Sequence, residues 1–108
     1  MTRAALALIL LPLPAQAELE MITARYSCDR GVEVPVTYVN ADDQSVVTLN
    51  IDGRQISLYQ EKAASGLRYG WPSDGSNYVW VTKDDAATLY WKDETRTETP
   101  ILTDCKKQ

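Results

Sequence analysis

Apolar and polar residues alternate along the middle of the chain, a pattern typical of half-buried β-strands rather than of helices. The first alternating run covers residues 32–38, where valine or tyrosine occupies every second position. A second run covers residues 47–51 and a third covers residues 55–58. Between the last two lie Asp52 and Gly53, two residue types that tolerate positive φ. The pattern therefore predicts two strands joined by a two-residue hairpin turn.

Shorter runs predict further strands in the second half of the chain. These runs cover residues 67–70, 78–82 and 88–92, and a last short strand is expected before Cys105. Residues 71–77 are dense in turn-forming types and have no periodic apolar face, which indicates a loop. Residues 83–87 could form a single turn, but nothing after Glu18 sustains helical periodicity over three turns.

The spacing of the strands indicates the fold class. Several short strands, roughly 8 to 12 residues apart, favour one antiparallel sheet that closes into a barrel or folds into a sandwich. Pro35 cannot donate to a strand ladder, so the strand at residues 32–38 is predicted to lie at an edge or to carry a bulge. No repeat or linker divides the sequence, and we expect a small all-β protein with a single domain.

The first 17 residues have the pattern of a secretory signal peptide. Arg3 supplies a positive start, an apolar run follows over residues 4–13, and small residues end the segment at Ala17. The run is about half of the roughly 20 residues that a membrane span needs, although an uncleaved anchor is the alternative. We expect cleavage after Ala17, a mature domain at residues 18–108 without membrane insertion, and a periplasmic location. A lipoprotein signal would need a cysteine at the cleavage point, and Cys28 lies well downstream.

Charge and composition narrow the classes of partner. The chain has 108 residues and no histidine. Residues 1–17 contain one basic and no acidic residue, so the remainder carries 10 basic and 15 acidic residues and a formal net charge of −5. This negative charge argues against a nucleic-acid partner, because binding to phosphates needs clustered positive charge, whereas it is compatible with a basic protein partner. Three tryptophans and six tyrosines with no phenylalanine suit a thin β-protein whose aromatic rings span the interior.

Cys28 and Cys105 stand near the two ends of the mature sequence. In an exported chain of this size two cysteines indicate a disulfide, and only one intramolecular connectivity exists. On the chain-entropy treatment such a bridge contributes about 4 kcal/mol to the stability of a small domain. A metal site is the weaker alternative, because two cysteines this far apart without histidine do not make a zinc spacing.

Two short segments carry the candidate chemistry. Residues 64–69 supply the hydroxyl of Ser65, and residues 78–84 supply the ammonium of Lys83, where two neighbouring strands could present both to one partner. Without histidine neither group has an obvious general base beside it, which favours a blocking protein over an enzyme. Trp71 precedes a proline in the expected loop, and a large aromatic side chain there could contact a partner.

The order of these segments along the chain resembles the MliC/PliC family, the membrane-bound and periplasmic bacterial inhibitors of c-type lysozyme. The resemblance covers nearly all of the mature domain and rests on a spaced set of motifs. The matching segments are Tyr26-Ser27-Cys28-Asp29-Arg30-Gly31, residues 36–40, the Ser-Gly-x-x-Tyr motif within residues 64–69, residues 78–83, residues 86–90 and Cys105.

The resemblance implies an eight-stranded antiparallel barrel with the two cysteines bridged, and a non-enzymatic inhibitor with no cofactor. It also implies that Ser65 and Lys83 enter the cleft of a c-type lysozyme and engage its catalytic carboxyl groups. Gly66 would let the backbone turn or approach the partner closely. Arg68 and Tyr69 belong to the motif and are expected to position the loop. Inhibition of this kind would protect peptidoglycan as a bacterial defence.

The sequence also departs from the family pattern. The loop at residues 71–77 is longer than usual and could add contacts or obstruct the lysozyme cleft, Asp84 stands where glycine is frequent, and Ala63-Ala64 replaces a more serine-rich approach. Two other functions stay open. One is an enzyme with Ser65 and Lys83 as a catalytic dyad, which needs a buried lysine. The other is a periplasmic binding module for a different envelope protein or a small ligand.

Overall fold

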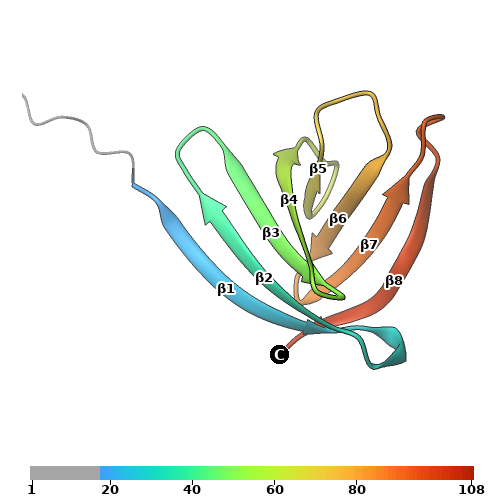
Figure 1. Cartoon of the computed structure of the whole chain (residues 1–108). Helices are drawn as coiled ribbons and strands as arrows, with labels where there is room; N and C mark the ends of the chain where they lie inside the picture. Colours follow the sequence, from blue (N-terminus) through green and yellow to red (C-terminus); the bar gives the residue numbers. More distant parts are fainter. Residues whose placement is uncertain (1–17) are drawn as a thin grey trace, which may run out of the picture.

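The computed structural model describes residues 18–108, which form one closed antiparallel barrel with the strands in chain order (Figure 1). The elements are β1 (Glu20–Ser27), the 3-10 turn η1 (Asp29–Gly31), β2 (Glu33–Asn40), β3 (Ser45–Ile51), β4 (Arg54–Glu61), β5 (Leu67–Gly70), β6 (Asn77–Lys83), β7 (Ala86–Lys92) and β8 (Glu98–Lys107). The described part has no helix long and apolar enough to cross a membrane. The predicted signal peptide and its cleavage site lie outside the described residues.

The alternating runs form the strands that they predict, and the barrel is confirmed over the sandwich. In β2 Val34 and Val36 face the interior and are almost fully buried, while Glu33 and Pro35 are exposed. The predicted hairpin joins β3 to β4 through Asp52 at φ 56° and Gly53 at φ 76°. Both positive values explain why aspartate and glycine occupy this turn.

Three expectations about the strands are wrong or incomplete. No strand was predicted before Cys28, yet β1 covers Glu20–Ser27 and pairs with β2 along its whole length. The last strand was expected to be short, and β8 is the longest with 10 residues. Residues 83–87 do not form a helical turn, because Lys83 and Ala86 are paired across a two-residue hairpin at Asp84 and Asp85.

The expectation for Pro35 is also wrong, because β2 pairs on both sides and no register shift is found in it. The Arg25 carbonyl, opposite Pro35, accepts a hydrogen bond from the Gln108 amide at 2.9 Å and so points away from β2. Pro35 must therefore point toward β3. Pairing with β3 begins only at Val36, so the missing N–H of Pro35 removes no ladder bond.

Four aromatic side chains fill the centre of the barrel. The Tyr38 hydroxyl accepts a hydrogen bond from Trp80 Nε1 at 3.0 Å and shares one with the Tyr26 hydroxyl at 2.9 Å. The rings of Tyr26 and Trp80 meet edge to face at 5.2 Å, and those of Tyr38 and Tyr69 lie 5.7 Å apart. All four are buried, and they join strands β1, β2, β5 and β6. We call these residues the aromatic cluster.

The barrel closes where β1 meets β8, and this seam has few backbone pairs. Only Tyr26 and Ser27 pair with β8. The predicted disulfide is confirmed beside them, joining the buried Cys28 and Cys105. The turn η1 adds a side-chain bond, because Asp29 Oδ1 accepts the Thr103 amide at 3.0 Å. The disulfide therefore covalently fixes the weakest part of the barrel.

Removing the disulfide is expected to open the seam and to lower stability markedly. A bridge over 77 residues contributes about 4 kcal/mol on the chain-entropy treatment. The melting temperature of the exported protein should therefore fall on reduction, and the Cys28→Ser/Cys105→Ser double variant should match the reduced protein. An unchanged melting temperature in either case would show that the seam holds without the bridge.

Burial raises the pKa of Tyr38 well above its ordinary value of 10.0, and burial raises the pKa of Tyr69 as well. The folded state therefore retains phenolic protons that the unfolded chain loses, and stability is expected to fall as pH rises above about 10. Tyr38→Phe should make this alkaline decline shallower. At pH 7 the variant should lose about 1–3 kcal/mol, because Trp80 and Tyr26 lose their shared partner. Urea unfolding at both pH values measures this, and equal alkaline slopes would contradict it.

Candidate functional site

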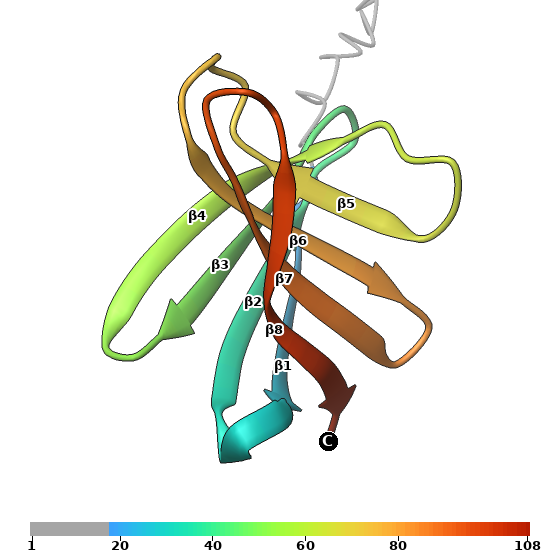
Figure 2. The same cartoon turned by 90° about the vertical axis from the view of Figure 1, so that its right-hand side faces the viewer.

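The β4–β5 loop, residues 62–66, and the β6–β7 turn lie at the same end of the β5–β6 pair (Figure 2). The register pairs Leu67 with Thr82, which places the end of the loop beside Lys83, the last residue of β6. Ser65 and Lys83 are both exposed. Among residues 18–108, Lys83 forms no ion pair. The structure thus brings the hydroxyl and the ammonium to one exposed surface.

Gly66 holds the loop against β6. It has φ 67°, and a Cβ built on it would lie 2.3 Å from the Thr82 carbonyl oxygen and 3.4 Å from the Lys83 Cβ. The first atom belongs to the backbone and cannot turn aside. Glycine is therefore required both by the backbone conformation and by the close approach of the two chain segments. This contact fixes the neighbouring Ser65 beside Lys83.

Arg68 closes the base of the loop. Glu61, the last residue of β4, pairs with Arg68 in the sheet, and its carboxylate accepts a hydrogen bond from Arg68 Nε at 3.0 Å. The guanidinium also binds both carboxylate oxygens of Glu98 at the start of β8. This contact holds the pKa of Glu98 below its usual range. Gly70 leaves space for the Glu61 carboxylate, since a Cβ there would meet Glu61 Oε1 at 2.3 Å.

Arg68 and Tyr69 are placed to support the loop. Tyr69 is 1% exposed and belongs to the aromatic cluster, so its side chain offers no surface to a partner. Arg68 is partly buried between two carboxylates. The motif predicts positioning roles for both residues, and their burial is consistent with such roles. Glu61 and Glu98, which complete the ion-pair cluster, were not singled out from the sequence because their pairing depends on the fold.

Trp71 lies apart from Ser65 and Lys83. It begins the β5–β6 loop, which is at the opposite end of β5 (Figure 2). Its side chain is 37% exposed and its ring lies 5.6 Å from that of Tyr59. The loop at residues 71–77 was expected to add contacts to the lysozyme cleft or to obstruct it, but β5 separates this loop from the one that carries Ser65. Contacts from Trp71 would belong to a different part of any shared interface.

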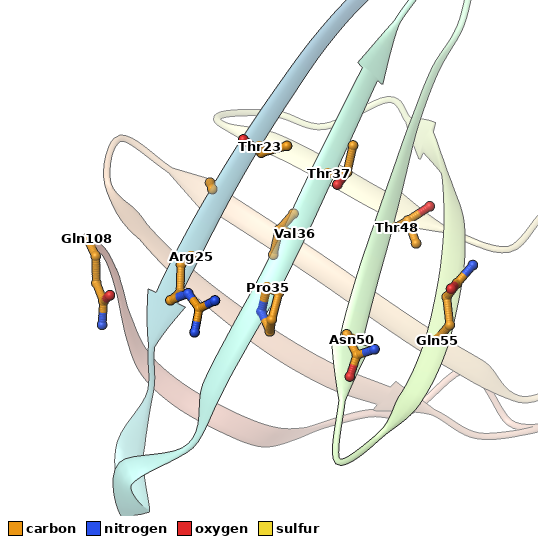
Figure 3. A pocket seen from close by; sticks show the side chains of 10 residues that line it. Thr23, Arg25, Pro35, Val36, Thr37, Thr48, Asn50, Gln55 and Gln108 are labelled. Carbon is orange, nitrogen blue, oxygen red and sulfur yellow. The ribbon is translucent and has the colours of Figure 1, made fainter.

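A recess flanks the β4–β5 loop on the side of β2 and β3. It has a volume of ≈ 560 Å³ and is lined by the β2–β3 loop, including Asp42 and Asp43, and by Lys62, Ala63 and Gly66. A second recess of ≈ 570 Å³ lies on the outer face of β1 to β4, where Thr23, Arg25, Thr37, Thr48 and Asn50 surround it (Figure 3). Neither recess contains Ser65 or Lys83.

The arrangement offers binding groups rather than the parts of a catalytic dyad. A lysine acts as a general base when burial removes its charge, and Lys83 is exposed at the end of a hairpin. Asp84, in the β6–β7 turn, has φ 54°, a value that glycine adopts freely. This value explains why glycine is frequent at this position in the family that the sequence resembles. Within residues 18–108, no group of three or more acidic, cysteine or histidine side chains is arranged to hold a metal ion.

Comparisons with known proteins identify the family and the fold that the chain resembles. The family model described as "Membrane-bound lysozyme-inhibitor of c-type lysozyme" matches residues 26–98. A curated relative, the membrane-bound lysozyme inhibitor of C-type lysozyme of Pseudomonas aeruginosa, is 32% identical over 85 residues, which are 76% of this chain. The match spans 64% of the length of that relative.

Two solved structures share the fold. One is Pseudomonas aeruginosa MliC in complex with hen egg white lysozyme, with a TM-score of 0.67, 27% identity, and coverage of 99% of this chain and 100% of that chain. The other is PliC-St, the periplasmic lysozyme inhibitor of C-type lysozyme from Salmonella typhimurium, with a TM-score of 0.67 and 21% identity. It covers 82% of this chain and 99% of its own. At that identity the second likeness supports the fold alone.

Gly66→Ala tests the contact that holds the loop. Alanine would have to adopt a positive φ, which costs roughly 1–2 kcal/mol, and would also clash with the Thr82 carbonyl. The variant should therefore unfold at a lower temperature. Gly75→Ala is the matched control, because the nearest atom to its Cβ is 3.9 Å away, and it should change stability by less than about 0.5 kcal/mol. Equal melting temperatures for the two variants would contradict the assigned contact.

Proposed function

The chain belongs to the family of membrane-bound lysozyme inhibitors of c-type lysozyme, and we propose that it binds a c-type lysozyme and blocks the catalytic cleft of that enzyme. A relative with the same fold has been solved in complex with hen egg white lysozyme, which supports this partner. The net negative charge of the chain is compatible with a basic protein partner. In this proposal the chain is not itself an enzyme.

Ser65 and Lys83 make the central contacts. A retaining lysozyme cleft holds one carboxyl group kept protonated and one kept ionised. The Ser65 hydroxyl can accept a hydrogen bond from the first or donate to the second, and the Lys83 ammonium is attracted to the ionised group. Closing the cleft removes water and strengthens these contacts. Carboxyl groups that are bound by Ser65 and Lys83 are not available to the substrate of the lysozyme. Inhibition of this kind forms and breaks no covalent bond.

The observation that carries the proposal is the contact of Gly66 with Thr82. This close approach of the loop to the end of β6 supports a preformed pair of binding groups, whose ordering would cost little free energy on binding. Arg68 and Tyr69 hold the loop from beneath. Trp71, at the far end of β5, would contact only the rim of a lysozyme interface, where truncation has small effects.

We further propose that the chain acts after export to the periplasm, with cleavage after Ala17. The relatives include membrane-bound and periplasmic inhibitors, which supports an envelope location. An inhibitor there would lie between peptidoglycan and a lysozyme that enters from outside. It would protect the cell wall without contacting it.

The test is the lysis of a peptidoglycan suspension by a c-type lysozyme, with and without the exported protein. Inhibition is expected for the unchanged chain. Ser65→Ala and Lys83→Ala should each weaken inhibition by about tenfold or more while the melting temperature stays the same, because each removes a desolvated polar contact.

Matched controls come from exposed positions away from the site. Ser73→Ala in the β5–β6 loop removes a hydroxyl, and Arg54→Ala at the start of β4 removes a positive charge. Both variants should inhibit as well as the unchanged chain. If the Ser65→Ala/Lys83→Ala double variant also inhibits fully, the site is misplaced. If the unchanged chain does not bind c-type lysozyme even at low salt, the inhibitor function is wrong and a binding module for another envelope component replaces it.

A further inference from the structure

The ion-pair cluster of Glu61, Arg68 and Glu98 is better shielded from solvent than the other ion pairs of residues 18–108. Its side chains are 31%, 26% and 28% exposed in that order. In each of the other pairs at least one side chain is more than half exposed, and these pairs are Arg25–Glu33, Arg30–Asp29 and Arg96–Asp74. Water and salt screen a shielded pair less than a surface pair. The cluster is therefore the place where a change of charge has the largest structural effect.

The cluster lies where the sheet gives the β4–β5 loop little support. β5 is the shortest strand, with four residues, and three residue pairs join it to β4. Glu61 directly precedes the loop, and Arg68 is the second residue after it. Glu98 belongs to β8, which pairs with neither β4 nor β5. The contact between Arg68 and Glu98 thus ties the base of the loop to a part of the barrel that backbone pairing does not connect to it.

Gly70 shows that the barrel makes room for this cluster. Gly70 is buried within β5 and is not among the glycines with positive φ, so its backbone conformation does not require glycine. Glycine inside a strand weakens the strand, because it has no side chain to pack. A Cβ at this position would lie 2.8 Å from Cδ of Glu61. The glycine therefore admits the Glu61 carboxylate beside Arg68.

The charged groups around Glu98 favour its ionised form. The cluster lines a recess of ≈ 450 Å³, whose other charged lining residues are Asp74, Lys92 and Arg96. Lys92 lies opposite Glu98 in the sheet, whereas Asp74 and Arg96 pair with each other. The hydrogen bonds from Arg68 are the main reason that the pKa of Glu98 lies below its ordinary value of 4.5. The stabilisation from this contact is therefore present above about pH 4.5 and is lost as pH falls through the lower folded value.

We propose that the contact between Arg68 and Glu98 makes inhibition sensitive to acid, because protonation of Glu98 releases Arg68, loosens the β4–β5 loop and weakens binding to a c-type lysozyme. A neutral carboxyl group accepts weaker hydrogen bonds than a carboxylate, by a factor of about two. Glu98 is thus a positioning residue, since it acts on Ser65 through Arg68 and not by contact with the partner. The effect on binding rests on the proposed function, whereas the loosening of the loop is a property of the free chain.

The first test measures the loop without a partner. Glu98→Gln keeps the shape of the side chain and removes its charge. Backbone order parameters of residues 62–66, measured by NMR relaxation, should be lower for Glu98→Gln than for the unchanged chain at about pH 7. They should become equal when both proteins are titrated to about pH 2.5. Glu33→Gln removes the carboxylate of an exposed ion pair in β2 and is the matched control, which should leave the loop unchanged at about pH 7.

The second test measures affinity for a c-type lysozyme over the same pH range. At about pH 7 the affinity of Glu98→Gln should be roughly threefold to tenfold lower than that of the unchanged chain, because binding must then order the loop. The two affinities should converge as pH falls through the pKa of Glu98. The carboxyl groups of the lysozyme also titrate in this range, but they affect both proteins equally and cancel in the ratio of the affinities.

Two results would overturn the inference. One is equal order parameters of the loop in Glu98→Gln and the unchanged chain at about pH 7, and the other is a ratio of affinities that does not change with pH. If Glu98→Gln does not fold, the unchanged chain decides, because a loop that stays equally ordered down to about pH 2.5 contradicts the proposal. A chain that binds no lysozyme at neutral pH refutes the proposed function and the acid effect on binding, while the order parameters still show whether Glu98 orders the loop.

Discussion

The aromatic cluster of Tyr26, Tyr38, Tyr69 and Trp80 links the closing strand of the barrel to the strands that carry the site. A small barrel has little interior volume, and large rings fill it only if their polar edges find partners. Here the Tyr38 hydroxyl serves two neighbours, and the described residues leave no buried side-chain nitrogen or oxygen unsatisfied. Tyr69 and Trp80 then fix β5 and β6 at the positions from which the loop and Lys83 project.

Two contacts hold the β4–β5 loop on this rigid interior. Gly66 lies close to the backbone of β6. Arg68, just after the loop, binds Glu61, just before it, and also Glu98 of β8. The side chains of Ser65 and Lys83 stay exposed. The proposed inhibition would benefit from this division, because buried residues bear the cost of ordering the loop before the partner arrives.

Much of the fold follows from the sequence, and the failures have physical causes. Alternation predicts β2, β3 and β4, and Asp52-Gly53 predicts their hairpin, because these features depend on neighbouring residues. β1 was missed because only its last two residues pair with β8. Met21 and Ile22, nearer its start, are both exposed, so buried and exposed side chains do not alternate there. The expectation of an edge or a bulge at Pro35 was wrong because β3 begins to pair with β2 only at Val36. The sequence around Pro35 does not show where that pairing begins.

The candidate site shows the same limit. The motif singled out Ser65 and Lys83, and the register brings them together. The ion pairs of Arg68 join residues up to 30 positions apart, and the distance of Trp71 from the site follows from strand direction, so neither could be read from spacing. The disulfide was predictable because two cysteines allow one connectivity.

The central claim is that the Ser65 and Lys83 surface occupies the catalytic cleft of a c-type lysozyme. The most direct measurement is the affinity of the chain for a c-type lysozyme whose cleft is saturated with a non-hydrolysed oligosaccharide, compared with the free enzyme. The account predicts that the oligosaccharide displaces the chain competitively, with apparent affinity falling in proportion to ligand occupancy. Equal affinity for the free and the occupied enzyme would contradict it.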